Sequence, residues 1–550
     1  MDSLTWRSLP GIFIFIIFIC LITAALPAPL PAQLLYLDNG IIRVEADRYN
    51  GGAINYLSKS GSDTSVVNIR DMGRYIQQSY YSGPDPFIPE GAWQHPAYDG
   101  WGWNPVQAGD VYGHYSWTPE KTVQGDTIYV RCIPKQWALN NVDSECTMES
   151  WITLDSNRVH VRCRLTNARE DSTLYSARHQ ELPAVYTVGT LHRLFTYTGD
   201  DPYTGGALTQ ISNSGPPWEY WNGTECWSAL VNDEDWGLGI YTPGAVLTVG
   251  GFHGTPGSGE PTDDNTGYIA PLHTDFIDHD IVYEYEYTLI LGDLYDDIRS
   301  YVYSQAPDPG PDFIFDRDRE HCLPKNLSDE SPPYSGFWRL SLDSSDPQVV
   351  LPPGMWQAEN VPVIYITCAH NTAGDQAEVF FAGADGSFSG DRRLTLTVNP
   401  DGEVHSYEVD LSSHPLYTGA VTRLRFDPVL SQTAGDVVDL YSITTDRVTS
   451  AELEKMPSAA ISIGPVAPNP FNPATTISFY VPTESRISMT VYDTAGRKVR
   501  TLIDGMIYEG RGEIVWDGRS DAGRPVASGI YYCCLRGRGM ARTGKLVLLR

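Results

Sequence analysis

The stretch DNGIIRVEADRYNGGAINYLS, from Asp38 to Ser58, indicates the fold of the first half of this chain. Apolar and polar residues alternate from Gly40 to Glu45, which is the period of a strand with one buried face. The pair Gly51-Gly52 then interrupts the pattern, and GGAINYL resumes it. The stretch therefore predicts two strands on either side of a glycine turn.

The same alternation recurs along the chain as far as about Tyr303. Every second residue from Val159 to Leu165 is apolar, which places His160 on the opposite, solvated face. Tyrosines and leucines alternate with polar residues from Tyr283 to Leu291 in the same way. Few segments could form a helix of several turns, and the one that fits best is Asp293 to Ser304, so we predict an all-β region.

Within this region, Val67 to Trp117 is rich in aromatic rings and is broken every few residues by Gly and Pro, which predicts long loops. The rings either fill the core or line a cleft where the CH faces of a sugar stack on them and neighbouring polar groups reach its hydroxyls. Both interpretations fit equally. Strand alternation would place Arg74 with Gln78 on one face, and Tyr75 with Gln77 on the other. The predicted substrate-binding residues are Arg74, Gln77, Gln78, Tyr81, Trp101, Trp103 and Asn104, with His114 as a further binding and catalytic candidate.

The segment SARHQELPAVY, from Ser176 to Tyr186, places four polar residues in succession in an otherwise apolar strand. Two of them must lie on each face whatever the register. His179 and Glu181 share one face, and we predict them as a catalytic acid and base, with Arg178 and Gln180 binding substrate. The alternative is a satisfied buried pair with no catalytic role.

A second cleft wall is predicted at WEYWNGTECW, from Trp218 to Trp227, with Trp218 and Trp221 binding substrate. Glu225 is a candidate second carboxylate, although an ordinary loop with surface acids explains it more simply. His253 and His273 lie in Gly-rich segments and are expected to be exposed.

No cluster of residues has the spacing of a metal motif, and no cofactor is predicted. The turn containing Asp263, Asp264, Asn265 and Gly267 offers ligands for a structural calcium ion, but a solvated turn is the simpler interpretation. The chain has no G-x-S-x-G elbow, P-loop or dinucleotide fingerprint. Serine hydrolysis, phosphoryl transfer and nicotinamide chemistry therefore have no support.

The 550 residues include 68 acidic and 38 basic ones, for a formal net charge of −30. Such a chain repels nucleic acids and anionic membrane surfaces, so neither is an expected partner. The length predicts about three or four domains.

The chain begins with one basic residue, Arg7, and an apolar run from Ile12 to Ile22, followed by small residues and Pro. The run is shorter than the roughly 18 to 20 residues that span a bilayer. We therefore predict a cleaved export signal that ends between Ala25 and Ala32, with a retained anchor as the alternative. No later stretch is apolar enough to form a transmembrane segment.

Eight cysteines follow the predicted signal, and none forms a CxxC pair, which argues against zinc-ribbon and thioredoxin-like sites. Export makes disulfides feasible, and Cys132 with Cys146 or Cys163 is the first pairing to test. The others are equally well explained as small buried apolar side chains.

The all-β block from Leu34 to Tyr303, with its opening of strand, Gly-Gly turn and strand, resembles the galactose-mutarotase-like β-supersandwich. That fold appears in sugar epimerases, glycoside hydrolases and polysaccharide lyases. The resemblance implies a carbohydrate-active region without naming its chemistry.

From Phe313 to Arg447, short alternating strands joined by Gly and Asp turns predict a β-sandwich. Two motifs resemble the jelly-roll modules of secreted carbohydrate-active enzymes. The resemblance implies glycan contact or domain packing, and a spacer that binds nothing is the alternative. The motif residues are Gly402, His405 and Tyr407, followed by Leu424, Arg425, Asp427 and Pro428.

The last region, Ile461 to Arg550, alternates from Ile487 to Val491 and turns between Asp493 and Gly496. It resembles the C-terminal sorting domain of the type IX (Por) secretion system, which is related to the immunoglobulin-like domain of flagellar hook-capping proteins. Cys533-Cys534 departs from the family pattern. The resemblance implies outer-membrane secretion machinery as a partner, and an extracellular or bacterial cell-surface location reached through the periplasm. It rests on Asn469 to Pro473, Tyr492-Asp493, Gly496-Arg497, Trp516 to Gly518, Gly523, Pro525, Ser528 to Tyr531 and Lys545-Leu546.

We therefore expect an exported all-β protein that acts on a polysaccharide or oligosaccharide by hydrolysis or β-elimination, as a glycoside hydrolase or polysaccharide lyase does. One alternative is a non-catalytic surface protein for glycan binding or adhesion, and another is a structural protein with no small-ligand site. The expected organisation is a signal peptide (1–32), a β-supersandwich (33–304), a linker (305–312), a jelly-roll sandwich (313–447), a linker (448–460) and an immunoglobulin-like domain (461–550).

Overall fold

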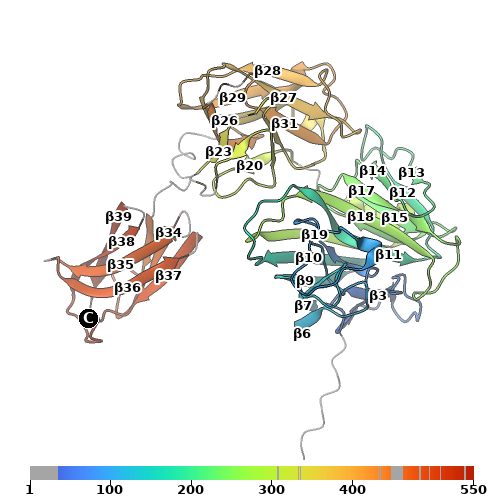
Figure 1. The fold of residues 1–550 in the computed structure, drawn as a ribbon, viewed down its shortest axis with the longest axis horizontal. Coiled ribbons are helices and arrows are strands. Elements are labelled where there is room, and N and C mark those ends of the chain that lie inside the picture. Colours follow the sequence, from blue (N-terminus) through green and yellow to red (C-terminus); the bar gives the residue numbers. More distant parts are fainter. Residues whose placement is uncertain are drawn as a thin grey trace, which may run out of the picture. The chain divides into compact units, whose positions relative to one another are not determined.

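The computed structural model is almost entirely β, as predicted (Figure 1). The predicted signal peptide at 1–32 and linker at 448–460 lie outside the described residues. No helix among the described residues is both long and apolar enough to cross a membrane. The structure describes residues 35–305, 309–331, 334, 336–342, 344–431, 433, 435–447, 462–481, 485–494, 496–507, 510–537 and 540–549.

Strands β1 to β19 form two large antiparallel sheets. The first sheet has the order β1 (Tyr36–Asp38), β2 (Ile42–Ala46), β3 (Ile54–Lys59), β4 (Ile76–Ser79), β11 (Arg178–Val188), β18 (Thr266–Asp275), β17 (Leu247–His253) and β14 (Glu219–Asn222), with β5 (Pro105–Val106) beside β4 and β8 (Lys135–Gln136) beside β5. The second has the order β13 (Thr209–Ile211), β12 (Arg193–Thr196), β15 (Trp227–Val231), β16 (Trp236–Tyr241), β19 (Val282–Asp293), β10 (Arg158–Asn167), β9 (Cys146–Asp155), β7 (Thr127–Ile133) and β6 (Trp117–Gln124).

The main core is built from the alternating strands that the sequence predicts. The apolar residues from Val159 to Leu165 in β10 are buried, and so are Tyr283, Tyr285 and Tyr287 in β19. His160 is only partly solvated: its Nδ1 lies 3.0 Å from the Thr288 hydroxyl, and the partial burial of the ring lowers its pKa. The predicted period is confirmed, while the solvated placement of His160 is not.

The helix predicted between Asp293 and Ser304 is confirmed. It consists of a π-helical turn, η2 (Leu294–Arg299), and an α-helical turn, α1 (Ser300–Tyr303). Asp293 begins it by accepting hydrogen bonds from the backbone N–H groups of Tyr295 and Asp296. A short 3₁₀ turn, η1 (Pro96–Tyr98), lies in the ring-rich stretch.

Strands β20 to β32 form three further sheets around a second core that includes Trp338, Phe381 and Phe426. The largest has the order β22 (Ser328–Asp329), β23 (Trp338–Ser341), β32 (Val437–Thr444), β26 (Val363–Asn371) and β29 (Val404–Asp410), with β20 (Asp312–Ile314) beside β32. The next has the order β21 (Leu323–Lys325), β24 (Gln348–Val350), β31 (Arg423–Asp427), β27 (Gln376–Ala382) and β28 (Arg393–Thr397), and β25 (Trp356–Gln357) pairs with β30 (Ala420–Val421). Two 3₁₀ turns are η3 (Ala358–Asn360) and η4 (Leu411–Ser413).

Strands β33 to β39 form a small sandwich whose core centres on Trp516, which packs against Phe471 and Tyr531 with ring centroids 5.4 and 5.1 Å away. The turn predicted at Asp493 to Gly496 is present, since Gly496 donates its N–H to the Asp493 carbonyl. One sheet has the order β33 (Ser462–Ala467), β34 (Thr475–Val481) and β37 (Gly510–Trp516), and the other β36 (Lys498–Ile507), β35 (Ser485–Asp493), β38 (Gly529–Gly537) and β39 (Met540–Leu548).

The disulfide expected between Cys132 and either Cys146 or Cys163 is absent. All eight described cysteines are free thiols, and all but Cys534 are buried. Burial raises the pKa of the Cys132 and Cys163 thiols to about 12, so both stay protonated. The buried cysteines pack as small apolar groups, the interpretation that the sequence allows for those outside the Cys132 pairing.

The glycine turn after β2 joins it to β3 in an antiparallel hairpin, as predicted. Gly51 and Gly52 have φ angles of +60° and +73°, in the left-handed region that side chains disfavour. A Cβ on Gly51 would also lie only 1.8 Å from the Gln107 carbonyl oxygen. This turn therefore requires glycine for two reasons: the left-handed backbone conformation at both positions, and the close approach of the Gln107 carbonyl to Gly51.

Gly51→Ala should lower the free energy of unfolding by about 3 kcal/mol or more, because it adds a backbone clash to a left-handed cost of about 1 to 2 kcal/mol. Gly40→Ala is the matched control, since φ is +82° there and a Cβ would meet nothing within 4 Å. Urea unfolding of the full chain, followed by tryptophan fluorescence, compares the two. Equal losses would mean that the contact with Gln107 is unimportant.

Candidate functional site

A groove lies on the face of the first sheet that points away from the main core. In the central strand β11, Leu182 and Val185 pack into the main core, while Ala184 and Tyr186 belong to a smaller apolar cluster with Tyr268. The register between β11 and β18 shifts between Glu181 and Val185. The strand therefore presents alternate residues to the groove on both sides of this bulge.

The groove has two lobes that share three residues, Tyr81, Trp101 and Glu181. The first lobe has a volume of about 510 Å³, and its further lining includes Asp85, Arg178, His179 and Tyr220. The second has a volume of about 870 Å³, and its further lining includes Arg74, Tyr98, Tyr112, Trp218 and His253. Each lobe is large enough for a small organic ligand.

Glu181 is the central titratable group of the groove. Its Oε1 accepts a hydrogen bond of 3.0 Å from the Tyr81 hydroxyl, and the Tyr268 hydroxyl is a second partner. Burial raises the pKa of Glu181, and the two hydrogen bonds oppose that rise. Burial also raises the pKa values of Tyr81 and Tyr268 well above 10, so both phenols remain donors.

His179 shares the strand face of Glu181 and lines the same lobe, as the alternation predicts. Its Nδ1 lies 2.8 Å from the Thr274 hydroxyl, and its ring is 6.3 Å from that of Tyr220. Burial lowers the pKa of His179, which favours the neutral imidazole. Next to it, Arg178 forms an ion pair with Asp85.

Three predicted binding residues line the second lobe with their polar groups already engaged. The Arg74 guanidinium bonds to the Asp263 and Asp264 carbonyls and to the Asp264 carboxylate. The Gln77 amide donates to the carbonyls of Met72 and Arg74 and accepts from the N–H of Ala108. Asn104 donates to the Tyr80 carbonyl and accepts from Trp101 Nε1. These residues shape the lobe, whereas Trp218 and Trp101 present ring surface to it.

Four residues predicted to bind substrate are instead part of the core. Gln78 donates to Ser150, Trp103 Nε1 donates to Glu145, and Trp221 Nε1 donates to Ser228. Gln180 is fully buried and bonds to both backbone groups of Tyr81. Trp103 borders the first lobe but is only 1 % exposed, so no ligand can stack on its face.

The predicted pairing of Arg74 with Gln78 on one face is wrong, because Tyr75 breaks the strand alternation. Its φ of +75° reverses the direction of the side chains that follow. Gln77 consequently joins Arg74 at the second lobe, and Gln78 is buried with its amide bonded to Glu149 and Ser150. Nothing in the sequence signals a left-handed tyrosine.

His114, predicted as a binding and catalytic residue, is not among the residues that line either lobe. Its Nδ1 lies 2.9 Å from the carboxylate of Asp110, which is itself fully buried. Asp110 also accepts hydrogen bonds from the N–H groups of Tyr112 and Asn141. His114 therefore belongs to a structural network at the outer end of the second lobe.

Glu225 has a structural role. Its carboxylate is completely buried and accepts hydrogen bonds from Arg299, Tyr303 and Trp227 Nε1. The sequence could not distinguish this acid from the exposed Glu219, six residues earlier.

The calcium ligands suggested by the turn at Asp263 are also engaged. Asp264 is paired with Arg70 and Arg74, and Asp263 accepts the N–H of Glu260. Across the described parts of the chain, no group of three or more His, Cys, Asp or Glu residues is arranged to hold a metal ion.

Sequence reasoning missed several groove residues. Asp85 lies in a Gly-Pro turn and Tyr220 in the exposed part of β14, so neither differs in pattern from a surface residue. His253 was expected to be exposed but lines the second lobe. Tyr186 and Tyr268 are stacked with ring centroids 4.6 Å apart, and the alternation of their strands would place both among ordinary core residues.

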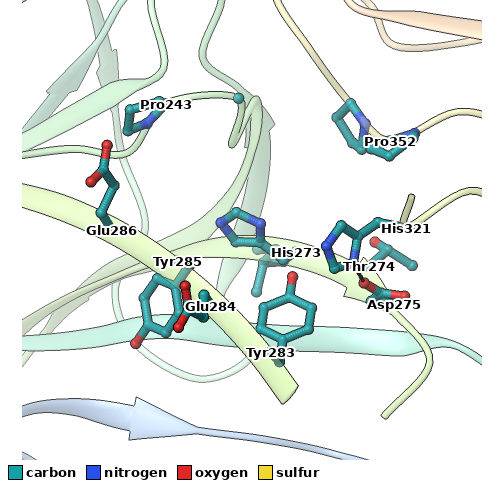
Figure 2. Close-up of a pocket in the computed structure, with 13 residues that line it drawn as sticks. Pro243, His273, Thr274, Asp275, Tyr283, Glu284, Tyr285, Glu286, His321 and Pro352 are labelled. Carbon is teal, nitrogen blue, oxygen red and sulfur yellow. Dashed lines mark hydrogen bonds and ion pairs between the residues drawn. The ribbon is translucent and has the colours of Figure 1, made fainter. Parts of the chain in front are cut away.

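A second polar cavity, of about 310 Å³, lies beside β18 and β19 (Figure 2). Figure 2 shows His273 close to His321, which bonds to Asp275 and packs on Tyr283. His273 is half-buried, contrary to expectation, and burial together with His321 lowers its pKa to about 4. The aromatic rings here are buried and Asp275 is already paired, so this cavity is the weaker candidate for a sugar site.

Comparison with known proteins supports the fold. Residues 471–536 match the family described as FlgD Ig-like domain, which confirms the predicted immunoglobulin-like fold. No match was found among curated proteins.

Several solved structures are similar to about half of the chain. The Slr1438 protein of Synechocystis sp. PCC 6803 is 9 % identical, with 48 % of this chain and 97 % of that chain covered and a TM-score of 0.30. A galactose mutarotase related enzyme of Lactobacillus acidophilus is 9 % identical, with 48 % and 99 % covered and a TM-score of 0.30. The 4-alpha-glucanotransferase of Thermococcus litoralis is 12 % identical, with 48 % and 37 % covered and a TM-score of 0.27.

Glu225→Ala should destabilise the protein by about 3 to 5 kcal/mol, because it leaves the buried Arg299 guanidinium without its carboxylate. The control Glu219→Ala removes an exposed acid from the same segment and should change stability by no more than about 0.5 kcal/mol. Urea unfolding of the full chain measures both. A stable Glu225→Ala protein would contradict the structural role of this acid.

Proposed function

We propose that this protein is an exported carbohydrate-active protein that hydrolyses an uncharged glycan in the groove around Glu181. The observation that carries the proposal is the half-buried carboxyl of Glu181, with its raised pKa, in the same lobe as the exposed rings of Trp101 and Tyr220. A carboxyl whose pKa is raised, beside a surface on which sugars stack, is the arrangement that acid-catalysed glycoside hydrolysis requires.

In the proposed reaction, Glu181 donates its proton to the glycosidic oxygen as the bond from that oxygen to the anomeric carbon breaks. A water molecule supplies the new hydroxyl at the anomeric carbon and loses its proton to a second carboxylate. Asp85 is the candidate for that role, because it lines the first lobe and Arg178 holds it in place. Its exposed fraction of 40 % leaves it accessible to water.

The same groups argue against β-elimination. That reaction needs a base and a cation or amide facing the carboxylate of an acidic sugar. Arg74 and Arg178 are already paired with Asp264 and Asp85, and Arg70 also pairs with Asp264. The pKa of the Tyr81 phenol is raised, which disfavours its use as a base. Hydrolysis of an uncharged glycan fits these pairings better.

A non-catalytic glycan-binding protein is the second candidate. It is favoured by the ion pair between Asp85 and Arg178, which neutralises the only carboxylate besides Glu181 that lines the first lobe among the residues that the structure describes. A binding protein needs the rings of Trp101 and Tyr220 but does not need a protonated Glu181. The two candidate functions therefore differ in whether Glu181 donates a proton.

Glu181→Gln should reduce glycan cleavage by about 100-fold or more while preserving binding, because the amide keeps the shape and loses the acidic proton. Release of new reducing ends from a panel of neutral polysaccharides measures cleavage, and absorbance of unsaturated sugars reports elimination. Glu219→Gln, outside the groove, is the matched control. Binding without turnover by the wild-type protein would favour the second candidate, and unsaturated products would contradict hydrolysis.

The pH dependence provides an independent test. Activity requires protonated Glu181, so it should be lost as the pH rises through the raised pKa of this residue. The hydrogen bond from Tyr81 lowers that pKa, so Tyr81→Phe should move the loss of activity to higher pH. A shift to lower pH would exclude Glu181 as the acid.

Export through the type IX route is part of the same proposal. Its support is the set of sorting-domain motifs at 461–550, together with the immunoglobulin-like fold. Residues 448–550 fused to a fluorescent reporter with an export signal should reach the surface of a bacterium that has this system. Retention of the fusion in the periplasm would argue against the route.

A further inference from the structure

We infer that the groove binds a chain of several sugar units across both lobes, so that Glu181 acts on an internal linkage and the protein cleaves within the chain. The inference rests on the proposed hydrolysis at Glu181. It adds the mode of attack and the residues that bind the ligand on either side of the cleaved bond.

The position of Glu181 between the lobes follows from three neighbouring strands. Along β11 the lining passes from His179 in the first lobe, through the shared Glu181, to Tyr186 in the second. Along β17 it passes from Val249 in the first lobe to His253 in the second. Antiparallel β18 agrees, with Leu272 in the first lobe and Tyr268 in the second. The groove therefore runs along the strands, with the acid between its lobes.

The length of this path exceeds one sugar ring. From His179 to Tyr186 the strand spans seven steps, which corresponds to roughly 23 Å at about 3.3 Å per residue. A single sugar ring is comparable in width to one aromatic side chain. A ligand that fills both lobes must therefore contain several rings, and the bond beside Glu181 lies between them.

Aromatic rings line the groove on both sides of the acid. Tyr220, 57 % exposed, lies in the first lobe, and Trp218, Tyr98 and Tyr112 lie in the second. Amphipathic rings present an apolar face to the CH groups of a sugar without requiring a charge. Both lobes therefore offer a sugar the same kind of contact.

The rings also continue beyond the second lobe. The Tyr112 ring lies 5.2 Å from that of His95 and 5.5 Å from that of Trp93. Neither His95 nor Trp93 lines the lobe, and Trp93 is 57 % exposed. These contacts place the exposed Trp93 ring next to a residue that lines the second lobe, but outside the lobe itself. Only a chain longer than the lobe itself would reach Trp93.

The test uses the full-length protein and neutral gluco-, xylo- and manno-oligosaccharides, from monosaccharide to hexasaccharide, labelled at the reducing end. We expect binding and cleavage to increase with length, and labelled products of intermediate length to appear first. Trp93→Ala should weaken binding of the hexasaccharide by about tenfold and leave the disaccharide unaffected. Tyr220→Ala should weaken binding of both. The control Trp117→Ala removes a ring that is 62 % exposed and lines neither lobe, and it should change nothing.

Each alternative result identifies what has failed. Equal binding of disaccharide and hexasaccharide, or release of terminal monosaccharide alone, would overturn the internal mode and leave hydrolysis at Glu181 intact. An effect of Trp117→Ala equal to that of Trp93→Ala would remove the outer ring surface from the site. The absence of binding and cleavage for all three series would overturn both the inference and the proposed function.

Discussion

The groove depends on one buried side chain, the amide of Gln180. Its Oε1 accepts the Tyr81 N–H at 2.6 Å, and its Nε2 donates to the Tyr81 carbonyl at 2.9 Å. These bonds replace a strand partner for the chain just beyond β4 and hold Tyr81 against β11. With its backbone held in this way, the Tyr81 hydroxyl lies within hydrogen-bond distance of Glu181. A fully buried amide with its donors and acceptor satisfied forms a rigid support, because any displacement would leave polar atoms unpaired in the core.

The ring-rich stretch from Val67 to Trp117 contains both rings that fill the core and rings that line the groove, the two roles that its composition left open. Trp103 is buried and anchored through Glu145, while Trp101, two residues earlier, is 39 % exposed and lines both lobes. Asn104 links Trp101 to the buried chain, because it accepts a hydrogen bond from Trp101 Nε1 and donates one to the Tyr80 carbonyl. Rings driven into the core thus fix the positions of rings that remain exposed. A loop without regular secondary structure acquires in this way the rigidity that a binding surface needs.

Local patterns in the sequence predicted the strands well and the site only in part. The period of two located β10, β19 and the face shared by His179 and Glu181, because burial of one sheet face determines that period. The same pattern failed at Tyr75, where a positive φ reversed Gln77 and Gln78. It also could not identify Asp85 or Tyr220, since their roles depend on which loops and strands meet across the groove. Buried acids such as Glu225 are satisfied by partners distant in sequence, which no local pattern reveals.

The placement of Glu181 also connects ligand binding to its protonation. Burial already disfavours the charged carboxylate, and the hydrogen bonds from Tyr81 and Tyr268 offset part of that cost. A sugar chain lying on Trp101 and Tyr220 would cover the part of the carboxyl that still faces water. Loss of that water raises the cost of the negative charge further, so the protonated form is favoured most when the groove is occupied. Contacts that bound a sugar chain would therefore also favour the protonated acid, and the hydrogen-bond partners of Glu181, Tyr81 and Tyr268, are neutral phenols that do not oppose this effect with a positive charge.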